Sequence, residues 1–268
     1  MNRYLFNLLL CCFSFILTHN FAQALDQSEI PDRMEDWKRV YLASYYRSGN
    51  HWVRFLIEEA THIATGSIVP DREIDGTCSR HLNKIFPWGG YSTKSGCREG
   101  SCRHSNPDEV VVIKCHYPVH RLKANGIFAE QPYLYTIRLV RHPIDSFYSE
   151  FVFKNKKRNS REKSFSEGLR KQINSWIAFQ SYWNEQPRVI TIRYEDILER
   201  PKYYLRSILD IIGYQVTNED IKRAVKAYPP SGGVLKHLSH YTEEDLELIE
   251  SQLGSLMHQF NYTINEVK

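Results

Sequence analysis

The stretch "YLASYYRSGNHWVRFLIEEA", residues 41–60, decides the fold. Its aromatic and apolar start predicts a buried strand over 39–46, and the helical spacing of its later apolar residues predicts a helix over 50–64. The basic turn "RSGN" (47–50) joins the two elements. Because backbone N–H groups at a helix N-terminus point toward an anion, this order of strand, turn and helix is typical of a phosphate cradle.

Strands and helices alternate along the rest of the chain. Apolar runs predict strands at 109–115, 133–140 and 188–194, and helical spacing predicts helices at 143–153, 165–184, 202–213, 217–228 and 242–260. This alternation predicts the α/β class, with a mostly parallel central sheet and helices on both faces. Ligands of such sheets bind beyond the carboxyl ends of the strands, so the residues at those ends form the candidate site.

Residues 1–24 have the pattern of a secretory signal peptide. An apolar run covers residues 4–17, and Ala22-Gln23-Ala24 is an A-x-A cleavage site. A membrane span needs about 20 apolar residues, so an uncleaved membrane anchor through residues 4–17 is the second interpretation. We therefore expect a single domain over 25–268, located in a Golgi-like lumen, outside the cell, or in the periplasm of a bacterium.

The composition is that of an ordinary globular protein. Of the 268 residues, 42% are hydrophobic and 25% are charged. This length is enough for one sizeable core. The net charge of +4 is a mild excess that gives no argument for nucleic-acid binding.

A Gly-rich, irregular insertion over about 66–108 carries three of the six cysteines. Four cysteines follow the leader: Cys78, Cys97, Cys102 and Cys115. An even number in a secreted chain indicates disulfides, and we expect one bridge among the first three. The alternative is a zinc site that adds His81 or His104, but the insertion has no C-x-x-C pair, so we expect no metal.

The turn after the first strand offers several groups to an anion. Arg47 can bind a phosphate through two donors, Ser48 adds a hydroxyl, and Gly49 lets the backbone come close. A magnesium-dependent P-loop has Lys and Ser/Thr at the helix start, where this chain has Asn50 and His51. That difference argues against an ATP or GTP site. Taken alone, the turn is equally consistent with an ordinary strand–turn–helix connection.

Three other strand ends carry polar groups. Lys114 and His116 alternate along one strand and therefore point to the same side, which suits acid–base chemistry beside an anion. Arg141 ends the next strand, and Ser149 reaches it only if the chain turns back at the intervening His-Pro. Tyr194 ends the fourth strand, before an acidic helix start. Surface side chains beside turns are the alternative interpretation.

In this order and spacing, the four segments resemble the sulfotransferases that use 3′-phosphoadenosine-5′-phosphosulfate (PAPS). The family's Pro-Lys/Arg-Ser-Gly-Thr/Asn-Thr-Trp loop is similar to residues 46–52, and its Lys-Thr-His-x-Pro is similar to 114–118. Its Arg-x-Pro-x-Asp-x₃-Ser is similar to 141–149. Its Tyr-Glu-Asp, before a Pro-Lys helix that ends in Gly, is similar to 194–213. The resemblance covers residues 40–213.

The resemblance implies a P-loop sulfotransferase fold and catalytic roles for three residues. His116 would take the proton from the acceptor hydroxyl, Lys114 would steady the sulfuryl oxygens, and Arg47 would neutralise the leaving phosphate. Catalysis of this kind depends on positioning and charge stabilisation, and cationic side chains take the place of a metal. Some luminal family members use a carboxylate as the base, so Glu58 or Glu59 is the alternative to His116; as a further alternative, both are salt-paired surface acids.

The resemblance also implies a donor-binding set. Its members would be Arg47, Ser48, Gly49, Asn50, His51, Trp52, Arg141, Ser149 and Tyr194. Trp52 would stack on the adenine and Tyr194 would approach it. Arg141 and Ser149 would hold the 3′-phosphate.

The sequence departs from the family pattern in a few places. Tyr46 replaces the usual Pro, and His51 replaces the usual Thr. The late Arg-Lys-Gly segment that helps to hold the 3′-phosphate is missing, and residues 229–249 occupy its place with a Gly pair and Lys236. Cys115 replaces Thr between the catalytic pair, and we expect it to point into the core as an unpaired thiol.

The sequence therefore predicts a secreted or luminal sulfotransferase that modifies a hydroxyl or amine of a small-molecule or glycan acceptor. The alternative is a catalytically inactive module that keeps the fold and binds an anionic ligand; the missing Arg-Lys-Gly favours it. A nucleotide kinase is a third option, which the lack of Gly-Lys-Ser/Thr disfavours. The basic run 154–163 is typical of a solvated loop, or else it guides an anionic acceptor such as a sulfated glycan.

Overall fold

The computed structural model describes residues 40–62, 65–67, 112–119, 135–158 and 164–264. These residues belong to one compact unit, Arg39–Lys268. The expected signal peptide, most of the insertion and the cysteines Cys78, Cys97 and Cys102 lie outside the described residues, so the leader and the disulfide stay predictions. Within the described residues, no helix is both long and apolar enough to cross a membrane.

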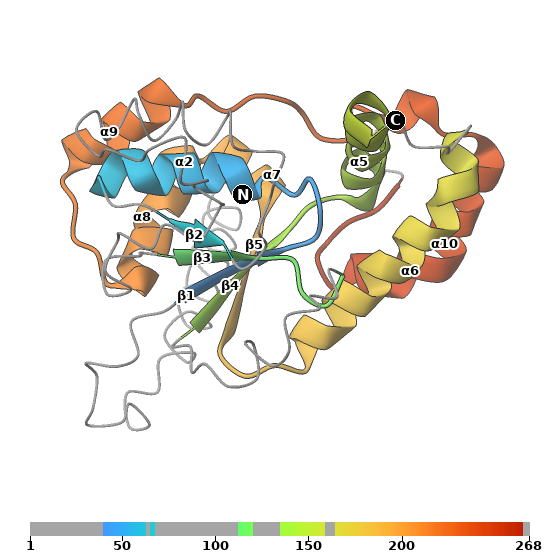
Figure 1. Ribbon diagram of the computed structural model, residues 1–268, viewed down its shortest axis with the longest axis horizontal. Helices are drawn as coiled ribbons and strands as arrows, with labels where there is room; N and C mark the ends of the chain where they lie inside the picture. Colours follow the sequence, from blue (N-terminus) through green and yellow to red (C-terminus); the bar gives the residue numbers. More distant parts are fainter. Residues whose placement is uncertain (1–39, 63–64, 68–111, 120–134, 159–163, 265–268) are drawn as a thin grey trace, which may run out of the picture. The chain divides into compact units, whose positions relative to one another are not determined.

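A five-stranded parallel sheet runs through the centre of this unit (Figure 1). Its strands are β1 (Val40–Ser44), β2 (Gly66–Ser67), β3 (Val112–Cys115), β4 (Tyr135–Val140) and β5 (Val189–Arg193). Their spatial order is β2-β3-β1-β4-β5, and each neighbouring pair is parallel. In the register, Ala43 of β1 lies between Cys115 of β3 and Arg138 of β4. The predicted parallel sheet is confirmed, with β1 in its middle.

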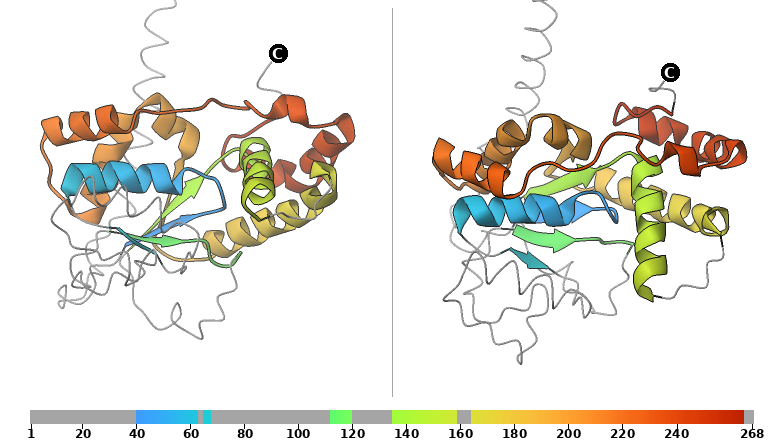
Figure 2. Two further views of the ribbon diagram at one scale, coloured as in Figure 1. Left: turned by 45° about the horizontal axis from the view of Figure 1, so that its top comes forward. Right: turned by 90° about the horizontal axis from the view of Figure 1, so that it is seen from above.

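Helices cover both faces of the sheet, as the sequence predicted (Figures 1 and 2). They are α2 (Asn50–Thr61), α5 (Pro143–Arg158), α6 (Phe165–Asn184), α7 (Tyr194–Glu199), α8 (Pro201–Ile212), α9 (Asn218–Ala227), the 3₁₀ helix η5 (Leu238–His240) and α10 (Glu243–His258). One hydrophobic core joins the sheet to α2, α8 and α9. A second core joins the opposite face to α5, α6 and α10.

Strand β1 is buried on both faces because its alternating side chains enter the two cores. Val40 and Leu42 belong to the core under α2, α8 and α9. Tyr41 and Ala43 belong to the core under α5, α6 and α10. Every residue of the strand is buried, which explains why its sequence is a continuous apolar run rather than a polar–apolar alternation.

Several element boundaries differ from the sequence prediction. Tyr194 begins α7 instead of ending β5, since the chain becomes helical directly after the strand. Helix α5 continues to Arg158, so residues 154–158 of the basic run are helical rather than part of a loop. Helix α2 stops at Thr61, because His62 takes a left-handed conformation with φ 57°.

Two helix ends and one buried thiol that the sequence predicted are confirmed. Gly213 ends α8 with φ 83°. The Thr242 side chain accepts the Asp245 N–H and the Asp245 carboxylate accepts the Thr242 N–H, a reciprocal cap at the start of α10. Cys115 is a free thiol that lies buried in the core under α5, α6 and α10.

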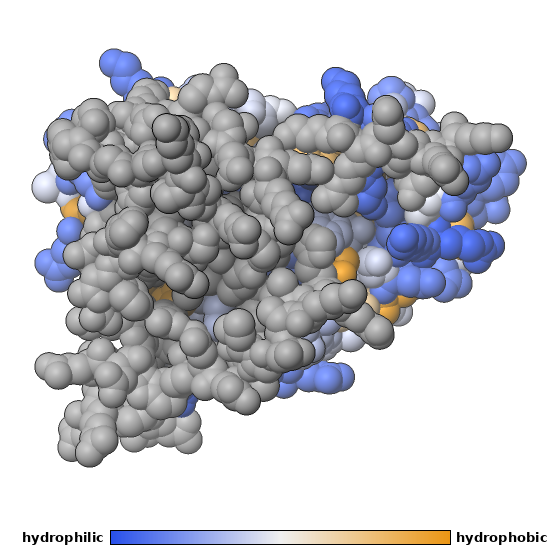
Figure 3. Space-filling view, viewed as in Figure 1, coloured by the Kyte–Doolittle hydropathy of each residue, from blue (hydrophilic) through white to orange (hydrophobic). Residues whose placement is uncertain are grey.

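The surface over α5, α6 and α10 is predominantly hydrophilic on the face shown in Figure 3. Among the described residues, the exposed large hydrophobic side chains are Tyr203 and Val234. Most other large apolar side chains of the described residues pack in or against the two cores.

His142 is a buried histidine that links the end of β4 to the C-terminal segment. Its Nδ1 accepts the Ile144 N–H at 3.3 Å, so its Nε2 donates to the Thr263 carbonyl at 3.2 Å. Both contacts require a neutral ring. Burial, with smaller contributions from the nearby cations Arg193 and Arg141, lowers the pKa of His142 to about 4, although the hydrogen bond to the Thr263 carbonyl opposes this shift.

We expect a His142→Gln variant to change how stability depends on pH. The unfolded histidine titrates near pH 6.5, so between about pH 6.5 and pH 4 the unfolded wild type binds a proton that the folded protein does not. The free energy of unfolding should therefore fall by about 3 kcal/mol from this group as the pH falls through that window. Above about pH 6.5 the group adds no slope. Urea unfolding at several pH values measures the difference, and equal slopes for the two proteins would contradict the assignment.

Candidate functional site

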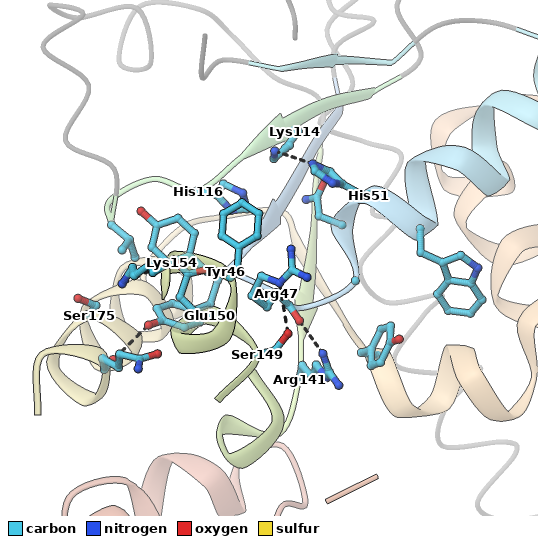
Figure 4. A pocket seen from close by; sticks show the side chains of 18 of the residues that line it. Tyr46, Arg47, His51, Lys114, His116, Arg141, Ser149, Glu150, Lys154 and Ser175 are labelled. Carbon is cyan, nitrogen blue, oxygen red and sulfur yellow. Dashed lines mark hydrogen bonds and ion pairs between the residues drawn. The ribbon is translucent and has the colours of Figure 1, made fainter. Parts of the chain in front are cut away.

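A pocket of about 580 Å³ lies where β1, β3 and β4 end, which is the place that the sequence predicted for a ligand. All predicted site residues except Ser48 line it: Arg47, Gly49, Asn50, His51, Trp52, Lys114, His116, Arg141, Ser149 and Tyr194. Ser48 is buried and donates its hydroxyl to the Tyr46 carbonyl at 3.5 Å. Figure 4 shows the labelled side chains converging from the β1–α2 turn, the end of β3 and helix α5.

The turn between β1 and α2 has the backbone shape of an anion cradle. Gly49 is the N-cap of α2, and no side chain caps this helix. Asn50 fastens the helix start to the strand, because its Nδ2 donates to the Leu42 carbonyl at 3.0 Å and to Ser44 Oγ at 3.1 Å. The first turn of α2 contains no acidic residue. The N–H groups and the positive end of the helix dipole therefore suit an anion.

Gly49 is needed in the cradle for two reasons. Its φ of 88° lies in the left-handed region, and a Cβ at this position would overlap the ring of Tyr194. The Tyr194 hydroxyl donates to the Ser231 carbonyl at 3.3 Å, and its ring meets Trp52 edge-on at a centroid distance of 5.8 Å. The two aromatic residues that the resemblance assigns to the adenine thus lie together beside the cradle.

Two guanidinium groups meet next to the cradle (Figure 4). Arg47 donates from Nε to Ser149 Oγ at 3.2 Å, and Arg141 donates from Nη1 to the Arg47 carbonyl at 2.8 Å. The chain does turn back after β4, since α5 begins at Pro143, and this brings Ser149 to Arg47 in a pocket that Arg141 also lines. Arg141 Nε is buried without a hydrogen-bond partner in the described part of the chain. An unsatisfied buried donor at this place suits an anionic ligand.

The cations of the pocket are costly to bury. The pKa of Arg47 is lowered, chiefly by burial; Glu150 opposes this shift, and Arg141 adds to it. Arginine nevertheless stays charged at physiological pH. An anion in the pocket would offset both the lost hydration and the repulsion between the two guanidinium groups.

Lys114 and His116 both reach this pocket, as their spacing predicted (Figure 4). Lys114 Nζ lies 3.0 Å from His51 Nε2; an ammonium can only donate, so His51 accepts as a neutral imidazole. His116 Nδ1 lies 2.7 Å from the Ser44 carbonyl, which requires a proton on Nδ1. The basic lone pair of His116 is therefore on Nε2.

Apart from Ser149, the sequence assigned no site role to the pocket residues of α5, of α6 and of the segment after α9. Together with three residues near the strand ends, they are Tyr45, Tyr46, Val119, Glu150, Phe153, Lys154, Lys171, Gln172, Ser175, Ser231 and Lys236. Glu150 and Lys154 form an ion pair at 3.6 Å. The sequence did contain a pattern that indicates the α5 residues, since positions 149, 150, 153 and 154 share one side of a helix. Only the packing of α5 shows that this side meets the pocket.

Glu58 and Glu59, the alternative bases, lie outside the pocket lining and have structural partners. Glu58 is buried and accepts the Thr65 N–H at 2.9 Å, while Arg54 donates to the Thr65 hydroxyl at 2.6 Å. Glu59 forms an ion pair with Arg223 at 3.5 Å. Both side chains thus join α2 to neighbouring segments. The described residues also contain no group of three or more His, Cys, Asp or Glu side chains placed to bind a metal.

Comparisons with known proteins agree with this geometry. A family profile described as "Sulfotransferase domain" matches residues 38–228. WSCD family member CG9164 of Drosophila melanogaster is 26% identical over 194 residues, which are 68% of this chain and 52% of the fly protein. WSCD family member AAEL009094 of Aedes aegypti is 25% identical over 190 residues, 66% of this chain and 51% of its own. The chain spans about half the length of these curated relatives.

Solved structures share the fold at low sequence identity. Retinol dehydratase in complex with androsterone and the inactive cofactor PAP has a TM-score of 0.53 and 17% identity, covering 86% of this chain and 83% of its own. Mouse sulfotransferase SULT7A1 complexed with PAP has a TM-score of 0.53 and 14% identity, covering 82% of this chain and 83% of its own. The predicted α/β fold of the P-loop sulfotransferase type is thereby confirmed.

Three glycine-to-alanine variants separate backbone strain from overlap in the cradle. Gly213→Ala places a Cβ in open space at φ 83° and should lower the free energy of unfolding by about 1 kcal/mol. Gly49→Ala adds the overlap with the Tyr194 ring and should lower the free energy of unfolding by about 1–3 kcal/mol more than Gly213→Ala does. Gly233→Ala, which meets nothing within 4 Å, is the control. Urea unfolding measures all three, and equal costs at Gly49 and Gly213 would contradict the packing of Tyr194 on the cradle.

Proposed function

This chain belongs to the sulfotransferase domain family, and on that basis we propose that it transfers a sulfuryl group from PAPS to a hydroxyl or amine of an acceptor. Arg47, Arg141, Lys114 and His116 converge on one pocket at the ends of parallel strands, and this arrangement carries the proposal. Cations at this place suit an anionic donor, and an imidazole beside them suits proton transfer.

The pocket residues fit the donor nucleotide. When bound, PAPS supplies a sulfuryl group activated by its link to the 5′-phosphate. The uncapped N-terminus of α2 and Arg47 would hold the phosphosulfate, and Arg141, with its unpaired Nε, would hold the 3′-phosphate with Ser149. Trp52 and Tyr194 would lie at the adenine. The two solved structures described as complexes with PAP support this assignment.

In the proposed reaction, the acceptor oxygen or nitrogen bonds to sulfur while the bond from sulfur to the 5′-phosphate oxygen breaks. His116 takes the acceptor proton on Nε2, and its Nδ1–H bond to the Ser44 carbonyl keeps this tautomer in place. Lys114 donates hydrogen bonds to the sulfuryl oxygens, and Arg47 neutralises the charge left on the phosphate. Positioning and fixed charge lower the barrier, as in phosphoryl transfer.

We assign the acceptor to the side of Arg47 where α5 and α6 meet the pocket. Tyr46, Glu150, Lys154 and Ser175 lie there in Figure 4. Hydroxyl, ammonium and carboxylate groups at a pocket wall are suited to hydrogen bonds with a polar acceptor. A small polar molecule or a glycan is therefore the acceptor class that we propose.

A catalytically inactive binding module is the second candidate. Residues 229–249 stand where the family carries its Arg-Lys-Gly segment, and this difference favours weaker nucleotide binding. Lys114 and His116 both reach the pocket, which favours the enzyme instead.

Titration calorimetry with 3′-phosphoadenosine 5′-phosphate (PAP), the spent donor, tests the donor site. We expect the wild type to bind PAP in the micromolar range. Arg141→Ala should weaken binding by about tenfold or more, because it removes a charge-assisted contact. Lys222→Ala, an exposed change on α9, is the control and should bind like the wild type. The absence of PAP binding by the folded wild type would contradict the donor site.

His116→Ala separates catalysis from donor binding. The variant should bind PAP like the wild type, yet transfer labelled sulfate from PAPS to a panel of polar acceptors about 10²–10⁴-fold more slowly. Equal transfer rates would rule out His116 as the base. PAP binding by the wild type without transfer to any acceptor would favour the inactive module.

A further inference from the structure

The segment between α9 and α10 takes part in the pocket although it lacks the family motif. Figures 1 and 2 show this connection running from α9 across to α5. Ser231 and Lys236 from this segment line the pocket together with Arg141 and Ser149. The chain therefore brings a cation to the place where the Arg-Lys-Gly segment is missing.

One buried carboxylate fixes the backbone on both sides of Lys236. Asp145, in the first turn of α5, is fully buried. Its Oδ2 accepts the Leu235 N–H at 2.9 Å, and its Oδ1 accepts the His237 N–H at 3.2 Å. Because the residues before and after Lys236 are held by the same group, the direction in which the lysine leaves the chain is set by Asp145.

The same carboxylate also lies behind the arginine of the donor site. Arg141 Nη2 is 3.9 Å from Asp145 Oδ2, and both side chains are almost completely buried. The Asp145 carboxylate thus lies next to Arg141 and orients Lys236 through the backbone on either side of it. Two cations held in this way suit a phosphate that carries close to two negative charges.

Other contacts hold the rest of the segment in place. The Ser231 carbonyl accepts the Tyr194 hydroxyl at 3.3 Å, and the Tyr241 hydroxyl donates to the Ile144 carbonyl at 2.7 Å. Between these points, Gly232 has φ 112°, and a Cβ there would lie 3.4 Å from Lys236 Nζ. The lysine side chain therefore folds back along its own segment. It forms no ion pair within the described part of the chain that would have to be broken by a ligand.

We propose that Lys236 binds the 3′-phosphate of the donor in place of the missing Arg-Lys-Gly, and that Asp145 is the positioning residue for both Lys236 and Arg141. This inference rests on the proposed function, since it concerns the same donor. It explains how the site keeps a second cation for the 3′-phosphate although the family motif is absent.

Calorimetric titration with two nucleotides tests the role of Lys236. PAP carries the 3′-phosphate, and adenosine 5′-monophosphate lacks it. Lys236→Met keeps the apolar stem of the side chain and removes the charge. We expect it to weaken PAP binding by about tenfold, as for the loss of a charge-assisted contact, and to leave the affinity for adenosine 5′-monophosphate within about twofold of the wild type. Lys222→Met on α9 is the matched control and should change neither affinity.

A double-mutant cycle tests whether Asp145 acts through Lys236. Asp145→Asn should lower the PAP affinity more than the adenosine 5′-monophosphate affinity, which a general loss of stability would not do. Combined with Lys236→Met, it should weaken PAP binding less than the product of the two single effects. If the double variant weakens PAP binding by the product of the two single effects, the positioning role of Asp145 is overturned. If Asp145→Asn does not fold, the same cycle is made with Asp145→Ser, a smaller side chain that removes the charge and keeps one oxygen as an acceptor.

The outcomes distinguish this inference from the proposed function. A wild type that binds neither nucleotide overturns both. A wild type that binds PAP, beside a Lys236→Met variant that binds PAP equally well, overturns only the role of Lys236. The role of Lys236 is also overturned if Lys236→Met weakens the binding of both nucleotides by the same factor, because the lysine would then not contact the 3′-phosphate.

Discussion

The burial of β1 on both faces is the constraint on which the rest of this structure depends. The strand lies between β3 and β4, and all of its residues are buried, so the chain can reach a ligand only beyond the end of the strand. Burying a large apolar side chain contributes about 1.5–3 kcal/mol to the stability of the fold. The strand therefore resists displacement from the centre of the sheet. The turn at 47–50 is therefore placed beside the ends of both neighbouring strands. Those ends supply Lys114 and His116 from one side and Arg141 from the other.

The pocket concentrates positive charge, and polar groups behind it keep that charge in position. Asp145 lies behind Arg141, and the Ser44 carbonyl fixes the His116 ring. Glu150 opposes the lowering of the Arg47 pKa that burial causes. A site arranged in this way needs little reorganisation when an anion binds, because the cations are oriented before the ligand arrives. The same arrangement suits the anionic nucleotide that we propose as the donor.

Features that depend on near neighbours in the sequence were predictable. The helix over 165–184 was predicted with its observed bounds, because its apolar spacing is regular and Ser164 caps it. Gly213 and Thr242 marked helix ends through backbone conformation and capping, which are local effects. The four motifs were visible for the same reason, since each occupies one strand end and the turn after it. Their order and spacing led to the family and to a set of site residues, all of which except Ser48 line the pocket.

By itself, then, the sequence determined the α/β class, the parallel sheet and the identity of the residues at its strand ends. Only the tertiary structure decided which distant groups meet there. Ser149 reaches Arg47 across 102 positions, and Asp145 reaches Leu235 across 90 positions. Periodicity and capping act over a few residues, so no local pattern encodes such distances. These contacts follow from the way that α5 and the segment after α9 pack on the sheet. Because of this packing, Lys236, which follows the Gly232-Gly233 pair, lines the candidate donor site.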